Sequence, residues 1–169
     1  MFQVNDTICY GTHGVCKIID ITKKEFGGVA LDYYVLEPVH HEKSTIYVPL
    51  HNQSLTGRMQ RVLSPEEIHQ IIQSMPEEET KWIANEHERR ECYRIALEQG
   101  DRKELMRLIK TIYLHGQEQK SKGRKLYAVD EKFLHEAERL IYDEFALALD
   151  IKPNQVLPFI REQIEKREK

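Results

Sequence analysis

The chain has few cysteines, one tryptophan and no long apolar run. Its 169 residues include three cysteines, and 31% of all residues are charged. No stretch of about 18 apolar residues is present, so no segment has the composition needed to cross a bilayer. No basic and then apolar leader is present either. We therefore expect a cytoplasmic protein without membrane contact.

The cysteines do not form a pattern typical of disulfide-rich or zinc-binding proteins. Cys9, Cys16 and Cys92 are an odd number without a Cys-x-x-Cys pair, which fits a reducing compartment. Cys9, His13 and Cys16 could supply three zinc ligands, but a structural zinc site takes four. Cysteines in strands are more often buried as small apolar residues. We expect no metal and no other cofactor.

Motifs of common enzyme classes are also missing. The chain contains no Gly-x-x-x-x-Gly-Lys-Ser/Thr phosphate loop, no Gly-x-Ser-x-Gly turn and no His-Glu-x-x-His motif. Neither catalysis nor a small-molecule substrate is therefore expected. A metal-dependent enzyme is a distant alternative, which metal analysis of the purified protein would test.

Charge is distributed unevenly along the chain, although the net charge is only -3. Residues 64–80 contain five acidic residues and no Lys or Arg, whereas residues 81–125 contain 12 Lys and Arg against seven Asp and Glu. Salt limits the influence of each charge to about 8–10 Å, so a local basic block can bind phosphates even in an acidic protein. Residues 81–125 are the candidate nucleic-acid contact.

Residues 1–63 show the pattern of short antiparallel strands. Apolar, β-branched and aromatic residues alternate in runs at residues 8–10, 15–21, 30–36 and 45–50, with turn residues between them. About sixty residues of short strands and hairpins predict a small antiparallel β-barrel of the SH3 or Tudor type. The expected fold class is α+β, because helical spacing follows.

The helical part is expected to span residues 64–169. Ser64, Pro65 and Glu67 predict a capping box with proline at the first helical position. Gly100 is expected to end the second helix. Later helices are expected to begin at Thr80, Asp101 and Asp130, and Pro153 and Pro158 predict a turn with a short, frayed helix at the end.

The single tryptophan, Trp82, lies near the expected start of the second helix. Residues 85–91 are all polar, so this part of the helix has no apolar stripe to bury and is expected to project into solvent. At about 100° per residue, Arg89 would lie within about 20° of Trp82 around the helix axis. An exposed aromatic beside arginines can wedge base steps and hold phosphates. The alternative is that Trp82 packs on the barrel at the junction between the domains.

Several segments resemble a known family. Residues 4–15 have the form Val-x-Asp-x-apolar-x-Tyr-x-x-His-Gly-apolar, and the similarity continues at residues 32–36, 46–49, 82–101 and 140–149. Together these segments resemble the CarD/CdnL-type bacterial transcription regulators. Their RNA-polymerase-interacting domain also occurs in the transcription-repair coupling translocase, whose motor motif is missing here.

The resemblance implies a docking surface for the β subunit of RNA polymerase. This surface is an exposed strand edge of the barrel, and the corresponding residues are Lys24, Thr45, Tyr47 and Val48, with Tyr47 where some members carry arginine. In strand pairing the main-chain hydrogen bonds supply affinity whatever the side chain. We therefore expect Val48→Pro to abolish docking.

For the helical domain the resemblance implies promoter binding at the upstream edge of the melted DNA. Trp82 would enter the minor groove, and Lys81, Arg89, Arg90 and Arg94 would contact phosphates without reading the sequence. These expectations describe a monomeric, non-enzymatic regulator that stabilises the open promoter complex. The alternative is a protein-interaction module that binds polymerase or another protein without touching DNA.

Overall fold

The computed structural model describes residues 1–41 and 43–169, which divide into two compact units, Met1–Val62 and Leu63–Lys169. The predicted boundary lay after residue 63. Each unit has its own hydrophobic core. In the described part of the chain, no helix has the length and apolar character required to span a bilayer.

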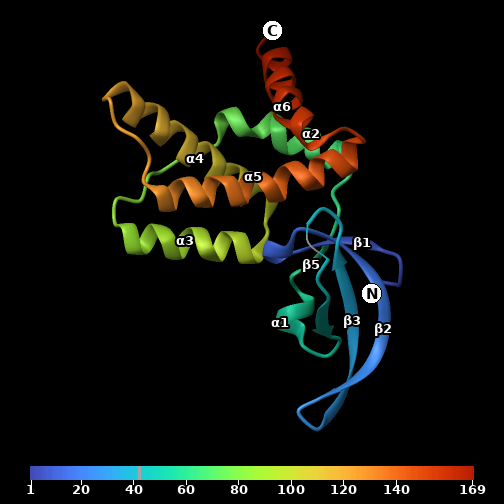
Figure 1. Ribbon diagram of the computed structural model, residues 1–169. Coiled ribbons are helices and arrows are strands. Elements are labelled where there is room, and N and C mark those ends of the chain that lie inside the picture. Colours follow the sequence, from blue (N-terminus) through green and yellow to red (C-terminus); the bar gives the residue numbers. More distant parts are fainter. Residues whose placement is uncertain (42) are drawn as a thin grey trace. The chain divides into compact units, whose positions relative to one another are not determined.

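The N-terminal unit is a five-stranded antiparallel sheet (Figure 1). Its elements are β1 (Thr7–Tyr10), η1 (Gly11–His13), β2 (Val15–Phe26), β3 (Val29–Pro38), β4 (Ile46–Pro49), α1 (Gln53–Thr56) and β5 (Met59–Arg61). The strand order is β4-β3-β2-β1-β5, so β4 and β5 lie at opposite edges and do not pair within the described residues. The α+β class is confirmed, but the sheet is open where a closed barrel was expected.

Two glycines shape the longest hairpin of the sheet. Gly27 and Gly28 join β2 to β3, and both have positive φ angles, 60° and 80°. A two-residue turn of this kind matches the twist of the flanking strands. A β-bulge between Ile18 and Asp20 interrupts the ladder further along. Both strands of this hairpin, β2 and β3, are longer than the runs predicted at residues 15–21 and 30–36.

One face of the sheet carries the core of this unit. Alternate residues of a strand point to the same face. The core residues are Ile8, Tyr10, Cys16, Ile18, Tyr34, Leu36, Val48 and Met59. Leu55 of α1 packs against this cluster, so α1 covers the core face.

The second unit is entirely helical in the residues described. Its elements are α2 (Pro65–Ser74), η2 (Met75–Glu77), α3 (Glu86–Gln99), α4 (Arg102–Ser121), α5 (Ala128–Leu149) and α6 (Pro153–Glu168). The helix α5 packs against α2, α3, α4 and α6 and is the central element of the unit (Figure 1).

Three local helix signals are confirmed by the structure. Ser64 and Glu67 form a reciprocal capping box at the start of α2. Gly100 ends α3 with a left-handed φ of 67°. The Asp101 carboxylate accepts a hydrogen bond from the Glu104 amide at 3.0 Å and begins α4.

Two predicted helix starts are wrong. Asn85, not Thr80, caps α3, because its side-chain oxygen accepts a hydrogen bond from the Glu88 amide at 2.9 Å. Trp82 therefore lies in the loop before the helix. The helix α5 begins at Ala128, two residues before Asp130, which is fully buried in its first turn.

The C-terminal helix is longer than predicted. Pro153 occupies the first turn of α6, where its missing N–H is not needed, and the helix continues through Pro158 for 16 residues. Val156 and Ile160 are buried in the helical core. Tertiary packing of this face outweighs the local cost of the internal proline.

Candidate functional sites

The outer edge of β4 offers main-chain groups for strand pairing. The amide of Leu50 donates to the carbonyl of Asp32 on β3 at 3.0 Å, and the register pairs Val48 with Tyr34 and Tyr47 with Val35. In an antiparallel pair the hydrogen-bonded positions alternate. The amide of Val48 therefore points toward β3, whereas the amide and carbonyl of Tyr47 point away from the sheet.

This arrangement corrects the role expected for Val48. Its side chain is 0% exposed and belongs to the core, so it cannot contact a partner, and its amide is used inside the sheet. A proline at this position would remove an internal ladder bond. Val48→Pro would therefore report on folding, and the diagnostic position for docking is Tyr47.

Two of the predicted polymerase contacts lie together. The Lys24 ammonium lies 5.2 Å from the centroid of the Tyr47 ring. Phe26 and Tyr33 pack edge-on against the same ring, with centroid distances of 5.5 and 6.1 Å. Thr45 is exposed just before β4. Lys24 on β2 and Tyr47 on β4 thus lie on the sheet face opposite the core, and Thr45 directly precedes the edge strand.

Trp82 is partly buried against the helical unit. Its ring is parallel to that of His115 on α4, with centroids 3.5 Å apart and an interplanar angle of 3°. The Arg89 guanidinium lies 4.4 Å from the ring centroid. Because Trp82 lies in the loop before α3, the predicted helical-wheel relation between Trp82 and Arg89 is wrong, although the two side chains do touch.

Arg89 is not available for phosphate contact. It is 2% exposed, and its Nε and Nη2 atoms donate to the two carboxylate oxygens of Asp130 at 2.8 and 3.0 Å. Its Nη1 donates to the carbonyl oxygen of Ile83 at 3.0 Å. The expectation of an exposed Arg89 is therefore wrong. Within the polar run at residues 85–91, Arg89 is buried because it pairs with Asp130, not because it packs against apolar side chains.

The other cations predicted to contact DNA differ in whether carboxylates already pair with them. Arg90 is exposed and lies 3.9 Å from Glu86, while exposed Arg94 bonds both Glu91 and Glu98. Carboxylates beside a cation reduce what it can offer a phosphate. Lys81 is exposed, and within the described structure no ion pair involves it.

Sequence reasoning missed a second group of cations around the loop between α4 and α5. Lys120, Arg124 and Lys125 are exposed, and no ion pair is found for their side chains among the described residues. The loop lies close to Trp82, because the Arg124 amide bonds the Gln119 carbonyl and the Gln119 side chain bonds His115. Tyr127, the last residue of this loop before α5, is 69% exposed. The basic block at 81–125 included these residues, but the assumed helix around Trp82 directed attention to α3.

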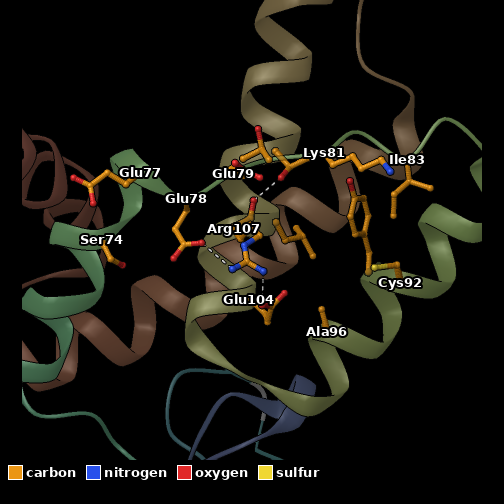
Figure 2. A pocket seen from close by; sticks show the side chains of 14 residues that line it. Ser74, Glu77, Glu78, Glu79, Lys81, Ile83, Cys92, Ala96, Glu104 and Arg107 are labelled. Atoms are coloured by element: carbon orange, nitrogen blue, oxygen red, sulfur yellow. Dashed lines mark hydrogen bonds and ion pairs between the residues drawn. The ribbon is translucent and has the colours of Figure 1, made fainter.

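A cleft of about 770 Å³ borders the Trp82 loop (Figure 2). Lys81 and Ile83 line it from that loop, and Arg107 bonds Glu78 and Glu104 within it. The hydrogen bonds from Lys103 and Arg107 hold the pKa of Glu78 below its usual value. Carboxylates on its rim make this cleft a poor phosphate site.

Cys16, one of the three candidate zinc donors in the sequence, is buried. Burial raises the pKa of the Cys16 thiol to about 11, whereas a zinc ligand must be a thiolate. Within residues 1–41 and 43–169, no three His, Cys, Asp or Glu side chains are arranged to hold a metal ion.

The His115 ring provides a test of the Trp82 environment by pH. Burial lowers the pKa of His115 below 6.5; Arg89 and Lys122 also lower it, and Glu118 and Asp130 oppose the shift. As pH falls, His115 is therefore protonated first in the unfolded chain. The free energy of unfolding keeps the full contribution of neutral His115 above pH 6.5 and loses it as pH falls through the folded pKa. We expect urea unfolding to show a larger loss between about pH 7.5 and about pH 5 for the wild type than for His115→Phe. Equal losses would contradict a lowered pKa.

One comparison with known families bears on these sites. Residues 2–63 match the family model of the CarD-like/TRCF RID domain. This domain is a protein-interaction domain that binds the β subunit of RNA polymerase. The match covers all five strands of the sheet, and the helical unit that follows fits the two-part organisation implied by the sequence resemblance.

Proposed function

Because residues 2–63 match the family model of the CarD-like/TRCF RID domain, we propose that the protein regulates transcription from RNA polymerase and also contacts promoter DNA. The family match is the observation that carries the polymerase half of the proposal. The DNA half is supported by Trp82 and by the unpaired cations nearby. The protein would act where the polymerase is, in the cytoplasm and on the nucleoid.

The polymerase half uses the outer edge of β4. A strand of the β subunit would pair with the Tyr47 amide and carbonyl and extend the sheet by one strand. Lys24 places a positive charge beside this edge, against the Tyr47 ring. An acidic or carbonyl-rich segment of the partner would complement that charge.

The DNA half keeps Trp82 and Lys81 from the set expected from the sequence and replaces the three arginines of α3 with cations around the loop after α4. Trp82 supplies an aromatic ring, and Lys81, Lys120, Arg124 and Lys125 supply charges that are free to meet phosphates. Neither a paired recognition helix nor a set of base-reading side chains accompanies them in the described structure. Recognition would therefore depend on the melted fork and its backbone, not on sequence.

The mechanism needs no chemistry. A protein that binds the open promoter complex more tightly than the closed one shifts the equilibrium by its difference in affinity. The docked N-terminal unit would supply a high local concentration, and the helical unit would supply the preference for melted DNA.

The experiment that tests the DNA half replaces Arg124 and Lys125 with alanine together. We expect binding to a polymerase–promoter complex to weaken equally on different promoters, and the slope of log affinity against log salt to fall by about one unit per lost phosphate contact. The control removes Lys166, which pairs with Glu162, and Lys169, two exposed cations near the C-terminus. An unchanged salt slope with weakened binding would indicate a protein partner, and no retention of core polymerase by the full-length protein would contradict the docking half.

The rival function is a protein-interaction module without DNA contact, and one observation favours it. A groove of about 460 Å³ between η2, α4, α5 and α6 has a mainly apolar surface, although Lys110, Glu138 and Arg161 are among its lining residues. Tyr113 and Leu114 on its rim are 49% and 46% exposed. Exposed apolar surface of this kind marks protein contacts. The salt experiment separates the two functions, because an apolar contact depends little on salt.

A further inference from the structure

The Trp82 ring is enclosed on both faces. The imidazole of His115 covers one face in parallel contact, with centroids 3.5 Å apart. The guanidinium of Arg89 also lies within 4.4 Å of the ring centroid. Two groups this close to one centroid cannot share a face without overlap, so Arg89 lies against the opposite face. No base can stack on Trp82 while both partners remain.

The two partners are held very differently. Arg89 is buried and makes two hydrogen bonds to Asp130 and one to the carbonyl of Ile83. Moving it would leave Asp130 as an unpaired buried charge. The Arg89 face of the indole therefore stays closed.

His115 is held by much less. Its ring is partly exposed, and among the described residues its hydrogen-bond partner is the side chain of Gln119, one turn along the same helix, at 3.3 Å. A change of rotamer would move the ring off the indole without disturbing the backbone of α4. Of the two faces of Trp82, only the one covered by His115 can open at low cost.

We propose that His115 covers a nucleobase-stacking site on Trp82, and that an unpaired base of the melted promoter displaces the imidazole and stacks on the indole above Arg89. This inference rests on the proposed DNA contact. Imidazole and nucleobase are both flat heteroaromatic rings, so they compete for the same face. Stacking of this kind tolerates any base, which agrees with contact that is independent of sequence.

The competition gives the two substitutions of His115 opposite effects. His115→Ala removes the cover, so the lifetime of the open complex should increase by about threefold, the size expected from one aromatic pair. His115→Phe replaces the imidazole with a phenyl ring, which is apolar and cannot be protonated. This ring should cover Trp82 more firmly, so the lifetime of the open complex should fall below that of the wild type. Trp82→Ala should shorten the lifetime by about fivefold or more.

Because Trp82 is the single tryptophan, its fluorescence in the free, full-length protein shows how well His115 shields the indole ring. Acrylamide should quench Trp82 fluorescence more in His115→Ala than in the wild type, and no more in His115→Phe. His69→Ala, which removes an exposed histidine of α2, is the matched control and should change neither quenching nor lifetime.

The outcomes are distinguishable. A shorter lifetime for His115→Ala that His115→Phe restores would overturn the proposal, because His115 would then support Trp82 and not cover it. Unchanged quenching in His115→Ala would also overturn it. A wild-type lifetime for Trp82→Ala would instead show that the proposed DNA contact fails, whatever His115 does.

Discussion

Asp130→Ala is expected to destabilise the helical unit by about 3–5 kcal/mol, because it breaks a buried ion pair. The carboxylate of Asp130 is the charge partner of Arg89, and both side chains are at most 2% exposed. Removing it leaves a guanidinium buried without a counter-charge. The thermal midpoint of unfolding, followed by circular dichroism, should fall by roughly 10–20 °C.

Two controls show whether charge pairing is the cause. The double variant Arg89→Met with Asp130→Leu removes both charges and should recover much of the loss, because an apolar pair of similar size is often as stable as a buried ion pair. Arg94→Ala breaks two solvent-exposed ion pairs and should change the midpoint far less, because solvent screens exposed charges. A midpoint for Asp130→Ala similar to that of Arg94→Ala would contradict the structural role of the buried pair.

The elements that the sequence predicted correctly depend on neighbouring residues. The Ser64 capping box, the left-handed Gly100 and the Asp101 cap each involve residues within four positions of one another. The strands of the first hairpins were visible for the same reason, since alternation and glycine turns are local properties. Only their lengths were underestimated.

The errors involve contacts between distant residues. Arg89 is buried because Asp130 lies beside it, 41 positions along the chain. With that partner unknown, an arginine in a polar run is most simply interpreted as exposed. The same applies to α6, in which Val156 and Ile160 are held by the core across an internal proline. Tertiary packing decided both cases against the local signal.

For the candidate sites, the sequence indicates segments but not the positions of their atoms. The family resemblance implied that Tyr47 and Val48 lie on one edge strand, but which amide faces outward depends on the register with β3. Likewise, the basic block contained the unpaired cations of the loop after α4, whereas ion pairs with Glu91 and Glu98 limit Arg94. Register and ion pairing are three-dimensional properties that composition does not specify.

Tyr47→Pro is expected to reduce binding of the full-length protein to core RNA polymerase by at least about tenfold, the value of one lost main-chain hydrogen bond together with the clash of the ring. The Tyr47 amide points away from β3, so the substitution leaves the internal ladder intact. Proline is tolerated in an edge strand at such a position. Binding can be measured by surface-immobilised polymerase, with the thermal midpoint as a check on folding.

The matched variant Tyr47→Ala separates the backbone from the side chain. It removes the ring that contacts Lys24, Phe26 and Tyr33 but keeps the outward amide. If strand pairing supplies the affinity, Tyr47→Ala should bind more tightly than Tyr47→Pro by a clear margin. Equal losses in the two variants would assign the contact to the aromatic side chain, and full binding by a folded Tyr47→Pro protein would move the docking surface away from β4 altogether.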